Sequence, residues 1–128
     1  MAYNVLIVDD SAIVRAVVEK TLRLSGCPLG EVLQAANGRE ALDQLNNHWV
    51  DIVFADINMP EMNGIEMVER MSATGLLKTV PVVIVSTERS VTRIEELRAK
   101  GVRAYLNKPF TPEEIKAILS EVLGFGKS

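Results

Sequence analysis

The sequence predicts an α/β protein built on a doubly wound, five-stranded parallel sheet. Five short apolar runs alternate with five helix-like stretches over nearly all of the 128 residues. Three of these runs are apolar without alternation, which is typical of parallel strands covered by helices on both faces. Strand–helix alternation with right-handed crossovers is the usual way to build such a sheet. A chain of this length fits a single domain.

The predicted strands are rich in valine and isoleucine, which pack well on a pleated surface. They cover residues 4–9, 31–35, 51–56, 81–86 and 103–107. The second and fifth runs contain polar residues such as Gln34 and Arg103, so we expect them at the two edges of the sheet. The predicted strand order is therefore 2-1-3-4-5, a flavodoxin-like (βα)5 arrangement.

Capping residues mark where the helices begin. The candidate caps are Ser11, Asn37, Asn63, Ser90 and Thr111. Asn37, Asn63 and Thr111 are each followed three residues later by a glutamate, as in a capping box. Apolar residues at helical spacing then mark the sides expected to face the core, including Val14, Val17, Val18 and Leu22 in the first helix and Val91, Ile94 and Leu97 in the fourth. Trp49, before the third strand, is interpreted as a packing residue.

Composition excludes several classes of function. The 17 acidic and 14 basic residues give a net charge of -3, which argues against a broad nucleic-acid-binding surface. A single cysteine permits neither an intrachain disulfide nor a multi-cysteine zinc site, and a single histidine excludes a histidine-rich metal centre. Without a signal peptide or a long apolar segment, we expect a cytoplasmic protein with no membrane partner. Residues 1–124 are predicted to form the domain, and residues 125–128 a loose C-terminal end.

Polar and charged residues follow the predicted strands at the point where each strand ends. Asp9 and Asp10 follow the first strand, and Asp56 ends the third. Ser86 ends the fourth strand, and Lys108 follows the fifth. Ligands of open parallel sheets bind beyond the carboxyl ends of the strands, where the strand order reverses. The sequence therefore predicts that these side chains meet at one edge of the sheet.

Such a group of residues favours metal-assisted phosphoryl chemistry. Two carboxylates 4 Å apart repel each other by about 4 kcal/mol at an effective dielectric of 20. Mg²⁺ removes this repulsion and accepts a few oxygen ligands together with retained waters. A phosphoryl group could then share its oxygens with the metal, Lys108 and Ser86. Asp56, at the end of a buried central strand, is the best-fixed candidate nucleophile.

The motifs at these positions resemble those of a known signalling family. VDDS at residues 8–11 is followed by Arg15, and DINMP at residues 56–60 is followed by Asn63-Gly64. Ser86, Tyr105 and KPF at residues 108–110 complete the set. Together these motifs resemble the receiver domain of two-component response regulators, of the single-domain chemotaxis (CheY-like) type. The resemblance spans essentially the whole chain.

The resemblance implies a role for each of these residues. Asp56 would accept a phosphoryl group from a sensor histidine kinase, a phosphotransfer protein or a small phosphodonor. Asp10 and Asp56 would bind Mg²⁺ directly, Asn58 would contribute its backbone carbonyl, and Asp9 would act mostly through water. Lys108 would pair with the phosphoryl oxygens, and Ser86 would donate a hydrogen bond to one of them.

The resemblance also implies a conformational switch. Tyr105 would turn inward when Ser86 moves, changing the surface of the fourth helix, fifth strand and fifth helix for an unknown downstream protein target. Asn58 and Glu88 would tune dephosphorylation, and the bond between Lys108 and Pro109 would be cis. We expect an output in chemotaxis or in a phosphorelay, and no direct control of transcription.

Two other classes of function stay open at this point. A phosphatase or mutase would use Asp56 as a nucleophile on small phosphate esters, with only Asp9 or Asp10 available as a general acid. A phosphorylation-independent binding module would merely keep the fold, although the intact set of acids, hydroxyl and lysine argues against it. Mass measurement after incubation with Mg²⁺ and acetyl phosphate separates the three classes.

Overall fold

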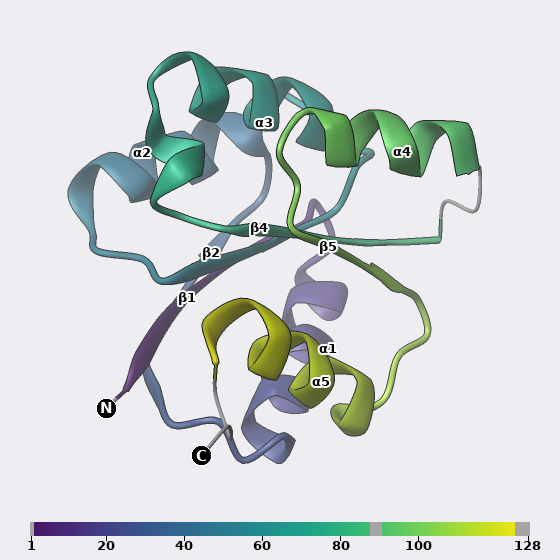
Figure 1. Cartoon of the computed structure of the whole chain (residues 1–128). Helices are drawn as coiled ribbons and strands as arrows, with labels where there is room; N and C mark the ends of the chain where they lie inside the picture. The colour runs from purple at the N-terminus through teal and green to yellow at the C-terminus, as the bar shows by residue number, and fades with distance from the viewer. Residues whose placement is uncertain (1, 88–90, 125–128) are drawn as a thin grey trace.

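Helices cover both faces of a five-stranded parallel sheet, as Figure 1 shows. The computed structural model describes residues 2–87 and 91–124. The strands are β1 (Tyr3–Val8), β2 (Leu29–Ala35), β3 (Ile52–Ala55), β4 (Val82–Ser86) and β5 (Ala104–Asn107). The helices are α1 (Ala12–Leu24), α2 (Gly38–Asn47), α3 (Gly64–Ala73), α4 (Val91–Ala99) and α5 (Pro112–Leu123), with a short 3-10 helix, η1 (Leu76–Lys78).

The sheet has the predicted strand order, β2-β1-β3-β4-β5, and all of its neighbouring strands are parallel. α2, α3 and α4 lie on one face, and α1 and α5 lie on the other (Figure 1). Every residue of β3 and β4 is buried, because helices cover these central strands on both sides. The prediction of central and edge strands is confirmed, and β2 begins two residues earlier than predicted, at Leu29.

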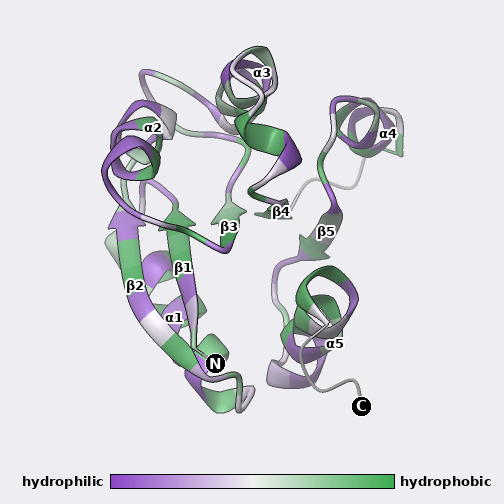
Figure 2. Cartoon of the chain, turned by 60° about the vertical axis from the view of Figure 1, so that its left-hand side comes forward, coloured by the Kyte–Doolittle hydropathy of each residue, from purple (hydrophilic) through white to green (hydrophobic). Residues whose placement is uncertain are grey.

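The core consists of two apolar layers that the sheet separates. One layer packs residues such as Leu6, Val53 and Met67 beneath α2 and α3. The other packs residues such as Ile7, Phe54 and Ile115 against α1 and α5. Figure 2 shows that β1 is largely hydrophobic, whereas the edge strand β2 carries hydrophilic segments. Since helices cover both faces of the sheet, polar groups can gather where the strands end.

Side-chain caps fix the beginnings of the helices. The Asn63 and Thr111 side chains each accept from the backbone of a glutamate three residues on, and both glutamates accept in return, which completes two capping boxes. The Asn37 side chain accepts from the Glu40 N–H, but the Glu40 carboxylate accepts from Ala36 N–H instead of Asn37 N–H. The predicted cap at Ser90 lies outside the described residues, as do Glu88 and the C-terminal end at residues 125–128.

Two helix residues that were expected to face the core, Val17 and Val91, are exposed. Val17 is 52% exposed because the inward stripe of α1 consists of Val18, Thr21 and Leu22, and Val17 lies to one side of it. Val91 is 67% exposed at the first residue of α4, a helix in which only Leu97 is buried among the described residues.

Trp49 was wrongly interpreted as a packing residue, because its side chain is 73% exposed. Its indole N–H donates to Asp51 Oδ1 at 3.1 Å, so a half-buried acid satisfies the polar end of the ring. No helix within the described parts of the chain combines the length and apolar character needed to cross a membrane.

Candidate functional site

The acids Asp9 and Asp56 are placed by neighbouring strands at the carboxyl edge of the sheet. Val8 and Ala55, the last residues of β1 and β3, are paired in register, and each is followed directly by an aspartate. The Asp56 N–H donates to the Val8 carbonyl at 3.0 Å, and the Asp9 N–H donates to the Ala35 carbonyl at 3.1 Å. The hydrogen-bond ladder of the sheet therefore continues through the backbone of both acids and fixes where their side chains start.

Three carboxylates meet at this edge. One carboxylate oxygen from each of Asp9, Asp10 and Asp56 lies within 4.8 Å of the other two. Asp9 is buried, Asp56 is half-buried and Asp10 is exposed. The structure thus brings together the three acids that the sequence predicted to meet, and it arranges them from the interior outward.

Burial raises the pKa of the Asp56 carboxyl above its ordinary value. The positive charge of Lys108 opposes this shift, while the negative charge of Asp9 adds to it and that of Asp10 adds less. The Ile57 N–H donates to Asp56 Oδ1 at 2.8 Å and so favours the ionised form. The raising effects outweigh the lowering ones, so the surroundings of Asp56 disfavour its ionised form.

Lys108 brings a positive charge from the end of β5, an edge strand that lies two places from β3 in the sheet. Its backbone N–H donates to the Ser86 carbonyl at 3.0 Å, which continues the pairing of β4 with β5. Its ammonium nitrogen lies 3.0 Å from Asp9 Oδ2 and 4.0 Å from Asp56 Oδ1. The bond between Lys108 and Pro109 is cis, as the resemblance implied.

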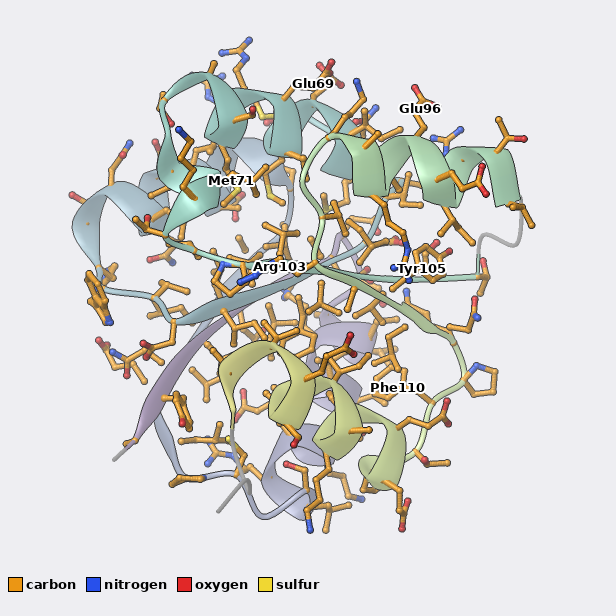
Figure 3. The ribbon with its side chains drawn as sticks, viewed as in Figure 1. Glu69, Met71, Glu96, Arg103, Tyr105 and Phe110 are labelled. Atoms are coloured by element: carbon orange, nitrogen blue, oxygen red, sulfur yellow. The ribbon has the colours of Figure 1, made fainter. Side chains whose placement is uncertain are left out.

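The remaining predicted residues lie on the elements that surround the acids. Ser86 is buried at the end of β4, opposite Asn107 of β5. Asn58 is exposed in the loop between β3 and α3, two residues after Asp56. Tyr105 is half-buried on β5 and packs against the core layer beneath α2 and α3 (Figure 3). Glu88, predicted to tune dephosphorylation, is outside the part of the chain that the structure describes.

The donor set of this site suits a hard divalent cation. It offers carboxylate oxygens from Asp9, Asp10 and Asp56, and the Lys108 ammonium lies within 4.0 Å of two of these acids. One ammonium group cannot balance three ionised carboxylates, so the site has a local excess of negative charge. Oxygen ligands of this kind at this spacing fit Mg²⁺ better than a metal that prefers sulfur or imidazole.

Comparison with known proteins decides the family. A family model described as the response regulator receiver domain matches residues 5–120. The chain is 39% identical over 124 residues to a chemotaxis protein CheY homolog of Campylobacter jejuni, covering 96% of this chain and 94% of that protein. The chain belongs to the response regulator receiver domain family.

Solved structures of similar proteins share the fold of this receiver domain. Chemotaxis protein CheY4 of Vibrio cholerae has a TM-score of 0.83 and 37% identity, covering 95% of this chain and 99% of that one. The CheX-CheY-BeF3-Mg+2 complex from Borrelia burgdorferi contains a chain with a TM-score of 0.81 and 29% identity, covering 94% and 89%. This receiver domain is therefore homologous to CheY chemotaxis proteins and belongs among signalling regulators rather than metabolic enzymes.

Ser11 and Arg15 belong to the motif found in the sequence, but their contacts with Asp9 were not predicted, and Gly38 was not singled out. The Asp9 carboxylate accepts from the Ser11 N–H at 2.9 Å, at the start of α1. The Arg15 guanidinium donates to the Asp9 backbone carbonyl at 2.6 Å and to Gln34 Oε1 at 3.0 Å. Gly38, at the start of α2, contacts the loop that follows Asp56. The sequence signal for Gly38 is a glycine at the first position of a helix, where alanine is the better helix former.

Proposed function

We propose that this receiver domain is a phosphorylation-operated switch whose phosphoacceptor is Asp56. The observation that carries the proposal is the meeting of three carboxylates with the Lys108 ammonium at the carboxyl edge of the sheet. Family membership supports the same reading. The phosphodonor would be a sensor histidine kinase, a phosphotransfer protein or a small acyl phosphate.

The transfer step follows from the position of Asp56. One of its carboxylate oxygens attacks the phosphorus atom, and the bond between phosphorus and the donor's nitrogen or oxygen breaks. The leaving group keeps the electron pair and, when it is a histidine, takes up a proton. Because Asp56 sits at the end of a fully buried strand, its carboxylate starts from a fixed place.

Asp9, Asp10, Asp56 and the Asn58 backbone carbonyl are the groups that would hold Mg²⁺. When bound, Mg²⁺ would supply positive charge that lets a phosphoryl group approach the acids. Asp10 and Asp56 would be direct ligands, and the more buried Asp9 would act mostly through water. Asp9 also holds the Lys108 ammonium 4.0 Å from Asp56 Oδ1, within reach of a phosphoryl group placed on Asp56.

Ser86 and Tyr105 are the proposed switch residues. Ser86 is buried on β4 and would donate to a phosphoryl oxygen, while Tyr105 is half-buried on the neighbouring strand β5. A phosphoryl group changes the conformation only if it binds one conformation better than the other, and its contacts with Ser86 and Lys108 provide that difference. The change would reach a downstream protein through the surface of α4, β5 and α5.

The protein partners are proposed from the homology of this chain to chemotaxis proteins. The CheX-CheY complex of Borrelia burgdorferi supports binding of a protein partner by a chain of this fold. The chemotaxis relatives support an output in chemotaxis, with a phosphorelay as the alternative. Asn58 and Glu88 would set how long the phosphorylated state lasts.

The test is intact-protein mass spectrometry after incubation with Mg²⁺ and acetyl phosphate. We expect one phosphoryl adduct per chain, which EDTA and Asp56→Asn abolish. Asp43→Asn removes an exposed carboxylate on α2 and serves as the matched control that keeps the adduct. An unchanged wild-type mass would favour a phosphorylation-independent binding module, and repeated release of phosphate from varied esters would favour a phosphatase.

A further inference from the structure

The turn between β2 and α2, residues 35–38, holds the two segments that carry the acids. The Ala35 carbonyl accepts from the Asp9 N–H at 3.1 Å, next to the end of β1. The Gly38 N–H donates to the Met62 carbonyl at 2.8 Å, in the loop between β3 and α3. None of the turn's side chains belongs to the acid cluster, yet its backbone contacts both sides of the site.

The Asn37 side chain links the turn to the same loop. Its Oδ1 accepts from the Glu40 N–H at 2.9 Å and so caps α2. Its Nδ2 donates to Glu61 Oε2 at 3.4 Å, so the two ends of one amide contact the helix and the loop. Asn37 is 6% exposed, and the Glu40 carboxylate accepts from the Ala36 N–H at 3.0 Å, which stiffens the turn.

The loop needs such support because its backbone is unfavourable at Glu61. With φ at 63°, Glu61 is the only non-glycine residue in the described parts of the chain with a positive φ. A side chain in the left-handed region crowds its own backbone, so neighbouring contacts must hold the conformation. Among the described residues, Asn37 and Gly38 donate hydrogen bonds from outside the loop to Glu61 and to the neighbouring Met62.

Gly38 is required here for close approach and not for its dihedral angles. Its φ does not lie in the positive, left-handed region, unlike that of Gly26, Gly75, Gly101 and Gly124. A Cβ built at Gly38 would lie 2.9 Å from the Met62 carbonyl oxygen and 3.0 Å from Met67 Cβ. Any side chain at this position therefore pushes the loop away from α2, although alanine would favour the helix itself.

We propose that Asn37 and Gly38 are positioning residues that set the place of the β3–α3 loop and thereby the Mg²⁺ affinity of the acid site. The loop begins directly after Asp56 and contains Asn58, whose carbonyl is the proposed third ligand. That Mg²⁺ binds at this site rests on the proposed function. That Asn37 and Gly38 hold the loop rests on the observed hydrogen bonds. Outer-shell contacts that orient ligands affect metal affinity substantially.

Asn37→Asp separates the loop contact from the helix cap. Aspartate keeps an oxygen that accepts from the Glu40 N–H, but it loses the donor to Glu61 and places two like charges together. We expect Mg²⁺ affinity, measured by isothermal titration calorimetry, to fall by roughly ten-fold. We also expect faster hydrogen exchange of the Gly38 amide in the metal-free protein, measured by NMR.

A reciprocal exchange tests whether the hydrogen bond itself matters. Asn37→Asp combined with Glu61→Gln reverses donor and acceptor and keeps the net charge, so it should restore both Gly38 protection and Mg²⁺ affinity to within about two-fold. Asn46→Asp adds the same charge on the exposed side of α2 and should change neither. Gly38→Ala, which keeps the Asn37 side chain, should weaken Mg²⁺ binding by roughly ten-fold.

Each result decides the proposal. Weaker Mg²⁺ binding in Asn37→Asp with restoration in the double variant supports it. Electrostatics alone predicts tighter Mg²⁺ binding when an acid is added, so unchanged or tighter binding with unchanged Gly38 exchange would overturn it. A wild type that fails to bind Mg²⁺ would refute the proposed function, and the exchange rates would still decide whether the turn holds the loop.

Discussion

The ammonium nitrogen of Lys108 lies 3.0 Å from the buried carboxylate of Asp9, although 99 positions separate the two residues in the sequence. The exposed fractions of the two side chains are 22% and 6%, so water screens this pair only in part. The ion pair connects the segment after β1 with the segment after β5 at the carboxyl ends of the strands. It also keeps a positive charge next to Asp56 in the absence of a metal.

Lys108→Met should destabilise the metal-free protein. The substitution leaves the buried Asp9 carboxylate without its cation and removes the charge that holds down the pKa of Asp56. We expect the free energy of unfolding in EDTA to fall by about 1–3 kcal/mol, measured by urea titration with circular dichroism. Lys116→Met, at an exposed position on α5, is the control, and an equal loss there would contradict the assigned role of the pair.

Asp10→Asn should have opposite effects on stability and on metal binding. Asp10 is the exposed member of three crowded carboxylates, so its removal relieves repulsion in EDTA. We expect the metal-free melting temperature to rise by a few degrees, corresponding to about 1 kcal/mol or less, and the Mg²⁺ affinity to fall. A melting temperature that falls in EDTA would count against crowding of the acids.

Asp56→Asn should stabilise the metal-free protein in a pH-dependent way. The pKa of Asp56 is raised in the folded state, so between its unfolded and folded pKa values the native protein binds more protons than the unfolded chain. Wild-type stability therefore decreases as pH rises through this window, and the destabilisation is complete above the folded pKa.

The measurement for Asp56 is the difference in unfolding free energy between Asp56→Asn and wild type in EDTA, as a function of pH. The variant should be the more stable at neutral pH, and its advantage should shrink as the pH falls through the raised pKa. Other titrating groups largely cancel in this difference. A difference that is constant with pH would show that the ionisation of Asp56 does not oppose folding.

Gly64→Ala should disturb the phosphoacceptor directly. A Cβ at this first residue of α3 would collide with the Asp56 carbonyl and lie 3.1 Å from Ile57 Cα. Since these are backbone atoms, the start of α3 must move, and we expect a loss of about 1–3 kcal/mol in urea titrations. Ser72→Ala, at an exposed position near the other end of α3, should leave stability within about 0.5 kcal/mol of wild type.

The sequence predicted the parts of the structure that depend on period and on strand ends. Unbroken apolar runs identified β3 and β4 as central strands. Because the carboxyl ends of parallel strands lie at one edge of the sheet, the sequence alone places Asp9 and Asp56 together. Capping patterns likewise predicted the starts of α3 and α5.

Side-chain exposure and contacts between loops were harder to predict. Val17 matches the helical period but lies beside the inward stripe, and Trp49 is apolar enough for the core yet projects from the amino edge of the sheet. The contacts of Asn37 and Gly38 with the β3–α3 loop depend on how two distant segments approach. Apart from the glycine at the first position of α2, local sequence patterns do not indicate such an approach.

The position of Trp49 has a practical consequence for optical spectroscopy. It is the only tryptophan in the chain, it is already 73% in contact with solvent in the folded protein, and it precedes β3 while Asp56 follows that strand. Its fluorescence should therefore change little when the acids bind a ligand, and its emission maximum should shift little on denaturation. An indole introduced beside the phosphoacceptor, for instance by Asn58→Trp, would give a reporter with the original tryptophan as an almost invariant background.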